Sequence, residues 1–230
     1  MKFSDRPSLT KILFAVGFAL SLATTHAQTT TNLLINPGAE TGDLTGWTPG
    51  GGSNPFAGTS SSLSDNIQPN SGSYDFCGGT GAPTGSLSQI VDLIVGHGIT
   101  AEMIDGGTLS AEISFWEQGY PQGTPSDDAG ITLTFYDGSE NAISDVSTPL
   151  IDSHDGVWEN FTAAYAIPDG TRSIGYTMNF NRNVGGDLDA FLDDNSLLIT
   201  PTDTPEPTST ALLAVGASFL GLVMVKRQRS

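Results

Sequence analysis

Cysteine is almost absent from this sequence, because Cys77 is the only one in 230 residues. A single thiol forms no disulfide within the chain, and it excludes a metal site built from several cysteines. An unpaired cysteine is more often a small buried hydrophobic residue than a reactive group. We therefore predict that Cys77 is buried, and we assign it no function.

Basic residues are also scarce, and most of them lie near the two ends. Of the eight lysines and arginines, three precede residue 12 and three follow residue 225, which leaves Arg172 and Arg182 between them. The region 28–205 contains 23 of the 25 acidic residues, so its net charge is 2 − 23 = −21, against −17 for the whole chain. Nucleic acid is excluded as a partner, because phosphate binding needs a basic surface. The excess of carboxylates favours a salty or calcium-containing exterior.

Catalytic motifs are missing as well. The region 28–205 has two histidines, His97 and His154, and no Gly-x-Ser-x-Gly segment, so a serine-hydrolase triad has little support. Two carboxylates hydrolyse a glycosidic bond when they face each other across about 5–9.5 Å, but among 23 acids a pair arises by chance. The sequence predicts no catalytic residues and no enzyme, with a glycan hydrolase as the minor alternative.

Residues 1–27 have the composition of a secretory signal peptide. Three basic residues precede an apolar run over 12–23, and a small-x-small cleavage site ends at Ala27. We expect the secretion machinery to export the chain and to remove this signal helix, so that the mature chain begins at Gln28. The alternative, an uncleaved anchor, fits less well because the apolar run is short.

The C-terminus has a Pro/Thr linker over 201–210, an apolar run over 211–225 and a basic end over 226–230. Fifteen residues span about 22 Å as a helix, less than the ~30 Å core of a bilayer, so a single membrane helix here is short or transient. The alternative, a buried C-terminal helix, would show a polar stripe that this run lacks. The positive-inside rule places the end of the chain in the cytoplasm, through Lys226, Arg227 and Arg229.

This order of motif, apolar run and basic end resembles the PEP-CTERM sorting signal of bacterial surface and secreted proteins. The residues that match the motif are Pro205, Glu206 and Pro207. The resemblance implies that an exosortase, a membrane cysteine protease, processes the tail near these residues. It also implies export to the cell envelope or the exopolysaccharide matrix, with transient anchoring in the membrane.

The region 28–200 has the pattern of a series of β-strands. Apolar and polar residues alternate within many of them, and Asp-Gly turns at 137–138, 155–156 and 169–170 separate others. We predict an all-β domain, a two-sheet antiparallel β-sandwich, with one helical turn within 97–105. The predicted strands cover residues 32–36, 73–77, 86–93, 108–117, 130–136, 142–146, 157–167, 173–181 and 190–200.

The first and last of these strands resemble those of galactose-binding-like jelly-roll domains, a superfamily that includes many carbohydrate-binding modules. The matching segments run from Asn32 to Trp47 and over 190–199. The resemblance implies a jelly roll and a structural calcium ion held by Glu40, Asp193 and backbone carbonyls. The alternative is that Glu40 and the Asp193-Asp194 pair are loop carboxylates that face water.

Sugar binding requires an exposed aromatic face beside hydrogen-bonding groups. Trp116 is out of phase with the apolar residues of its strand, so we predict that it faces outward with Glu112, and Tyr120 follows it closely. Arg182 is a further candidate, able to orient a hydroxyl or an acidic sugar. The alternative is that the aromatic residues pack under loops and that Arg182 pairs with a carboxylate. The hypotheses are therefore non-catalytic binding of a polysaccharide, or a purely structural surface or biofilm protein with no small ligand.

The mass of the mature protein in the envelope and medium fractions tests both ends together. We expect a chain that begins at Gln28 in both fractions and, in the medium, one that ends near Pro205–Pro207. A mature mass that still includes residues 1–27 would contradict the signal peptide. Retention of residues 226–230 in the medium form would contradict processing of the tail.

Overall fold

The computed structural model describes residues 28–59, 62–64 and 66–202. The predicted signal helix, most of the linker, the membrane helix and the basic end lie outside these residues, so they stay predictions. Within the part of the chain that the structure describes, no helix is long and apolar enough to cross a membrane.

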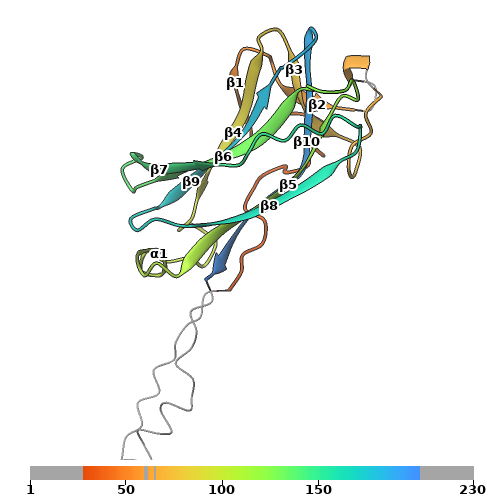
Figure 1. The fold of residues 1–230 in the computed structure, drawn as a ribbon. Helices are drawn as coiled ribbons and strands as arrows, with labels where there is room; N and C mark the ends of the chain where they lie inside the picture. Colours follow the sequence, from red (N-terminus) through yellow and green to blue (C-terminus); the bar gives the residue numbers. More distant parts are fainter. Residues whose placement is uncertain (1–27, 60–61, 65, 203–230) are drawn as a thin grey trace, which may run out of the picture.

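Ten strands form two five-stranded sheets that lie face to face, and all paired strands are antiparallel (Figure 1). The strand order is β1-β4-β9-β6-β7 in the first sheet and β2-β3-β10-β5-β8 in the second. The bounds of the first sheet are β1 (Thr48–Gly51), β4 (Thr84–Asp92), β9 (Ser173–Asn181), β6 (Asp128–Tyr136) and β7 (Ala142–Ser147). Those of the second are β2 (Phe56–Gly58), β3 (Asp75–Thr80), β10 (Asp187–Pro201), β5 (Leu109–Gly119) and β8 (Glu159–Ala166).

The topology is that of a jelly roll. Without the short strands β1 and β2, the sheets read β4-β9-β6-β7 and β3-β10-β5-β8, so consecutive strands change sheet at every step except β6 to β7. Eight strands wound in this way make the double Greek key of a jelly roll. The predicted β-sandwich is confirmed for the described residues between 28 and 202. The predicted helical turn is α1 (Ala101–Asp105), and a 3₁₀ turn, η1 (Ser62–Ser64), follows β2.

The hydrophobic core lies between the two sheets, as the alternation of the strands predicts. The inward residues of β5 meet those of β6 and β9, and they are almost completely buried. Trp47, just before β1, packs edge-on against Phe76 and Tyr176 at ring-centroid distances of 5.3 and 6.0 Å. The buried side chains of these three strands are Leu109, Ala111, Ile113, Phe115, Ala129, Ile131, Leu133, Phe135, Ile174, Tyr176, Met178 and Phe180.

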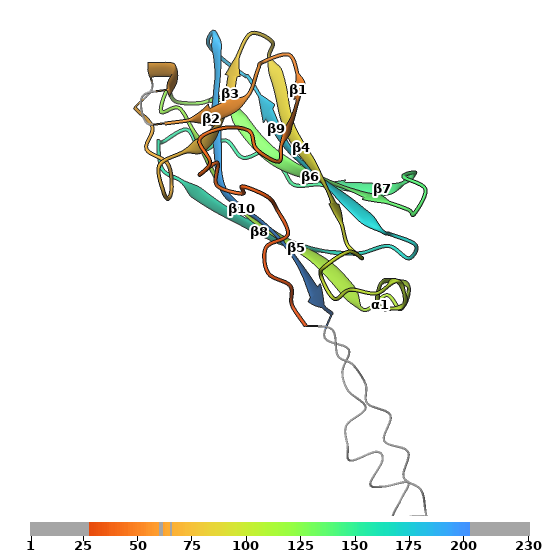
Figure 2. The same ribbon diagram turned by 180° about the vertical axis from the view of Figure 1, so that it is seen from behind.

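The prediction of a strand over 32–36 is wrong. This segment runs alongside β10 (Figure 2), where Leu33 N donates to Leu197 O at 3.0 Å, but it forms no regular ladder. The physical reason is Asn32, whose side-chain Oδ1 accepts from the backbone N–H groups of Leu34 and Leu197, both at 3.1 Å. A side-chain amide thus replaces a backbone carbonyl in the pairing.

A bulge in β10 between Asp193 and Ser196 fixes the N-terminal segment to the core. Asn195, which is 1% exposed, donates from its backbone N and its Nδ2 to Pro37 O at 3.1 and 3.0 Å. Its Oδ1 accepts from the buried hydroxyl of Tyr176 at 3.0 Å. One side chain therefore connects the first segment, the last strand and a core residue of the opposite sheet.

Replacing Asn195 should destabilise the fold more than replacing its neighbour. Asn195→Ala leaves the Tyr176 hydroxyl buried without a partner, which should lower the free energy of unfolding by about 1–3 kcal/mol. Ser196→Ala, the matched control in the same bulge, should change it by less than about 0.5 kcal/mol. Urea unfolding of the two variants measures both, and equal losses would contradict the role given to Asn195.

Candidate functional site

A second, smaller hydrophobic cluster lies on the outer face of the second sheet. Ile67, Cys77 and Phe191 are buried there, and Phe56, Leu63, Tyr120 and Trp158 pack against them. The segment that follows β2 covers this face, so the cluster is a minor core between that segment and the sheet. The prediction that Cys77 is buried is confirmed.

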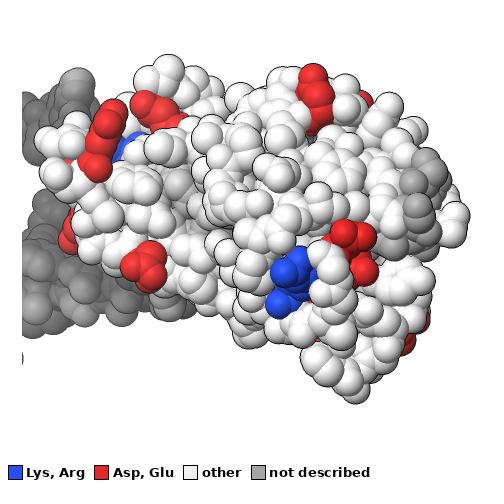
Figure 3. Space-filling view, turned by 90° about the horizontal axis from the view of Figure 1, so that it is seen from above, with Lys and Arg blue, Asp and Glu red and all other residues white. Residues whose placement is uncertain are grey.

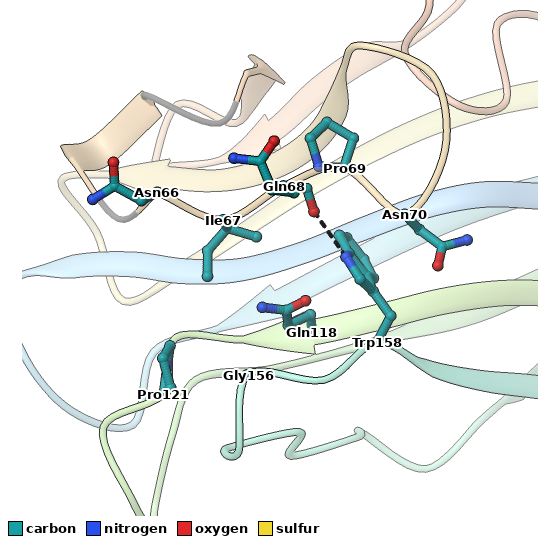
Figure 4. A pocket seen from close by; sticks show the side chains of 9 residues that line it. All are labelled: Asn66, Ile67, Gln68, Pro69, Asn70, Gln118, Pro121, Gly156 and Trp158. Atoms are coloured by element: carbon teal, nitrogen blue, oxygen red, sulfur yellow. Dashed lines mark hydrogen bonds between the residues drawn. The ribbon is translucent and has the colours of Figure 1, made fainter.

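A cavity of about 400 Å³ opens beside this cluster (Figure 4). The indole of Trp158 forms one wall, and its Nε1 donates to Gln68 O at 2.9 Å. Four side-chain amides accompany the indole, and none of the nine described lining residues carries a charge. The lining residues are Asn66, Ile67, Gln68, Pro69, Asn70, Gln118, Pro121, Gly156 and Trp158.

Strand register explains why Gln118 and Trp158 meet. Glu117 of β5 pairs with Glu159 of β8, and along their strands both lie in phase with the inward residues Phe115 and Phe161. Gln118 is the next residue along β5, and Trp158 is the residue just before β8. Both therefore turn to the outer face, and they lie beside each other there. The other wall belongs to residues 66–70, which are distant in sequence from both strands.

The bulge of β10 holds the end of that wall in place. Asn70 Nδ2 donates to Asp194 Oδ2 at 2.8 Å, and Ser71 Oγ donates to Asp194 Oδ1 at 2.7 Å. The Ser71 backbone N–H donates to Asp193 Oδ2 at 3.1 Å. Two adjacent carboxylates thus bind the segment where the cavity wall joins the sheet.

The structure brings only part of the predicted glycan-binding set together. Trp116 lies half-buried on the outer face of the second sheet, and Glu112 is exposed on the same face, about 13 Å away along the strand. Tyr120 packs in the small outer cluster. Arg182 lies just beyond β9 of the other sheet, where Nη1 donates to the carbonyls of Gly81 and Gly186. The role of these four residues stays a prediction.

Sequence reasoning missed Trp158 and Gln118 as residues of this cavity. Both alternate outward in their strands, and that pattern could have placed them on one face with Trp116. The contribution of residues 66–70 has no signal in the sequence, because it depends on how the segment after β2 folds over the sheet.

Glu40 and Asp193, the predicted calcium ligands, reach the same short segment. Glu40 Oε1 accepts from the backbone N–H groups of Ser73 and Tyr74, both at 3.0 Å, while Asp193 accepts from Ser71. Burial, and secondarily the charge of Asp194, raises the pKa of Asp193 to about 7, although the Ser71 N–H opposes the shift. A buried carboxylate of this kind fits a cation. No group of three or more His, Cys, Asp or Glu is arranged to hold a metal among the described residues, so backbone oxygens would complete this site.

Two further carboxylates are buried without full hydrogen bonding. Glu117 is 0% exposed, and neither of its oxygens has a hydrogen-bond partner in the described part of the chain. Burial raises its pKa to about 9, and the nearby charge of Glu159 adds to the shift. Burial also raises the pKa of Asp75 to about 6, where Cys77 Sγ donates to Oδ1 at 3.3 Å and Oδ2 has no partner.

One pair of carboxylates lies on neighbouring strands, β5 and β8. Glu117 and Glu159 are register partners, but Glu117 is inaccessible to solvent. His154 lies 3.6 Å from Asp152 Oδ1 in an exposed turn.

A scan of protein-family models and a search of curated proteins found no match for this chain. Solved structures do share its fold. An apo cyclase from Fischerella sp. has 16% identity and a TM-score of 0.50, over 78% of this chain and 100% of that chain. The CBM22-1 xylan-binding domain from Paenibacillus barcinonensis has 16% identity and a TM-score of 0.48, over 78% and 99%. The enzymatically active domain of bacteriophage CBA120 tailspike protein 4 has 15% identity and a TM-score of 0.48, over 73% of this chain and 21% of that chain. At 16% identity, the similarity to the cyclase shows the fold alone.

The buried carboxylates predict an unusual dependence of stability on pH. Their pKa values of about 9, 7 and 6 lie above those of the unfolded chain, so the folded protein binds more protons. Without bound cations the free energy of unfolding should therefore fall as the pH rises from about 4.5 to 9. Glu117→Gln should raise the melting temperature at pH ~8 and change it little at pH ~4.5.

Thermal unfolding in chelator-treated buffer measures this profile, with the exposed Glu159→Gln as the matched control. Glu159→Gln should raise the melting temperature at pH ~8 by less than Glu117→Gln does, because it removes only the charge repulsion between the two side chains. A wild-type melting temperature that rises between pH ~5 and ~8 would contradict the burial of an uncompensated carboxyl group.

Proposed function

We propose that this protein is an exported bacterial surface or matrix protein whose jelly-roll domain binds a glycan without catalysis. The observation that carries the proposal is the cavity beside Trp158, which combines an indole face with four side-chain amides. Pyranose rings offer apolar C–H faces and hydroxyl groups, and these two kinds of side chain complement them. A cavity of this size is in the range of small-ligand sites.

The charge of the domain favours a neutral glycan. Within the described part of the chain, Arg172 and Arg182 are the only lysine or arginine residues. Figure 3 shows a face where acidic residues are scattered and basic atoms are few. An anionic polysaccharide would meet a repulsive field, whereas the cavity presents uncharged donors and acceptors. Neutral hydroxyl groups are therefore the matched ligand.

The position of the two chain ends relative to the cavity agrees with a surface role. Thr30 N donates to Ile199 O at 3.0 Å, so the two described ends lie side by side at one end of the sandwich (Figure 1). Phe191, which pairs with Gln118 at the cavity, lies ten residues before Pro201, about 33 Å along β10. A tail attached there would hold the cavity away from the membrane.

The tail and the calcium ion belong to the same proposal. The motif at Pro205, Glu206 and Pro207 would direct the protein to an exosortase, which anchors or releases it at the envelope. A calcium ion between Glu40 and Asp193 would relieve the buried charge of Asp193 and secure the segment that ends the cavity wall. The proposal gives this ion a structural role and no catalytic one.

A purely structural role is the second candidate, and one contact favours it. Trp158 also ties Gln68 to the sheet, so the indole has a packing function without any ligand. The two functions differ in what happens when side chains are removed from the cavity without disturbing that hydrogen bond.

Affinity measurements with neutral polysaccharides and the full chain separate them. Trp158→Ala should abolish binding, and Gln68→Ala, which keeps the backbone carbonyl that Trp158 uses, should weaken it about tenfold. Tyr136→Ala, at the end of β6 in the other sheet, is the aromatic control and should change affinity by less than about twofold. Absence of any neutral-glycan binding, or binding that survives both cavity variants, would contradict the proposal.

A further inference from the structure

A small space lined by oxygen atoms lies over Gly119, at the inner edge of β5. A Cβ atom at this position would lie 2.8 Å from Ser126 Oγ, 3.0 Å from Asp127 O and 3.2 Å from Ser153 O. The three oxygens come from two separate segments, one before β6 and one between β7 and β8. Because glycine has no side chain, these three oxygens approach its Cα more closely than a larger residue would allow.

Glu117 shares this face of the strand. Residues two apart in a strand point the same way, so its side chain lies on the same side as the space over Gly119. Both of its carboxylate oxygens lack hydrogen-bond partners in the described residues, and the side chain is completely buried. The backbone N–H of Ser153 is close enough to lower its pKa, which places the carboxylate near the segment that contributes Ser153 O.

No basic side chain of the described chain compensates this carboxylate. Arg172 forms an ion pair with Asp105 at 2.9 Å, and Arg182 donates to the carbonyls of Gly81 and Gly186. The charged groups around Glu117 are acidic: Glu159 pairs with it across the strands, and Asp128 and Asp152 lie near enough to raise its pKa. The surroundings therefore attract a cation.

We propose that Glu117, Ser126 Oγ, Asp127 O and Ser153 O hold a calcium ion. All four ligands are oxygens, which hard divalent cations prefer, and calcium takes six to eight of them from carboxylates, carbonyls, hydroxyls and water. Backbone carbonyls that already accept one hydrogen bond, such as Ser153 O from Gly119 N, keep a second lone pair for a metal. Asp152 and Glu159, whose charges act on Glu117, are accessible to solvent.

This site is separate from the one formed by Glu40 and Asp193. Across β5 and β10, Glu117 pairs with Leu192 and its side chain points toward the sandwich interior. Asp193 pairs with Trp116 and lies on the outer face. The two calcium sites therefore lie on opposite faces of one sheet, and separate substitutions can remove them.

The competing explanation is a permanently protonated Glu117, which stays neutral by burial and binds no metal. The two explanations differ for Gly119→Ala, a substitution that leaves Glu117 intact but fills the space between the oxygens. With a protonated acid only packing changes, whereas with a metal site calcium binding is lost.

Calcium titration of the full-length chain, purified in detergent and stripped of metal, tests the proposal. Calorimetry gives the bound equivalents and thermal unfolding gives the calcium-induced shift, which at about a hundredfold excess over Kd should be about 5–10 °C. Glu117→Gln and Gly119→Ala should each lose about one equivalent and that part of the shift. Asp193→Asn should keep it.

The control for folding is the same variants without calcium. In chelator, Glu117→Gln should melt at or above the wild-type temperature, because it removes a buried ionisable group, so loss of binding cannot come from loss of fold. The proposal is overturned if the wild type binds no calcium. It is also overturned if both Glu117→Gln and Gly119→Ala keep the wild-type number of equivalents.

Discussion

The bulge in β10 is the constraint on which the rest of the structure depends. Three consecutive residues there make contacts with distant parts of the chain. Asp193 and Asp194 bind residues 70–71, and Asn195 binds Pro37 and the Tyr176 hydroxyl. Asp194 adopts a positive φ of 48°, which turns its side chain out of the regular alternation. The same bulge therefore holds the N-terminal segment, a core residue and the wall of the cavity in place.

The second constraint is charge. The domain buries Glu117, Asp193 and Asp75 although its described part has only two arginines, and neither arginine compensates them. Burying an ionised carboxylate without a partner is expensive, so such groups take up a proton or bind a cation. Jelly-roll folding and cation binding are linked in this account because the same strands that form the sandwich bury the carboxylates.

The sequence predicted most of the fold because period-2 alternation is strong in the long strands. The predicted strand over 173–181 coincides with β9, and the inward residues of β5 are those expected. The short strands β1 and β2 lack an alternating pattern, since Thr48–Gly51 contains one proline and two glycines. The 32–36 segment was predicted as a strand because its apolar residues resemble one, but the Asn32 side chain takes over part of its pairing.

The candidate sites were less predictable. Glu117 continues the inward series of Phe115, so its burial could be read from the alternation, but its lack of a partner depends on segments far along the chain. Trp158 could be placed on an outer face, whereas the residues opposite it come from a segment without regular structure. Long-range convergence of this kind follows from three-dimensional packing, which local sequence patterns do not encode.

The three tryptophans offer the most direct test of the central claim, which is glycan binding at the outer cavity. Their indole N–H signals in a ¹⁵N–¹H spectrum report on the core through Trp47, on the open face through Trp116 and on the cavity through Trp158. During titration with a neutral oligosaccharide, the account predicts that the Trp158 signal shifts while the Trp47 signal stays in place. A shift confined to Trp116, or three unchanged signals with every neutral glycan, would contradict it.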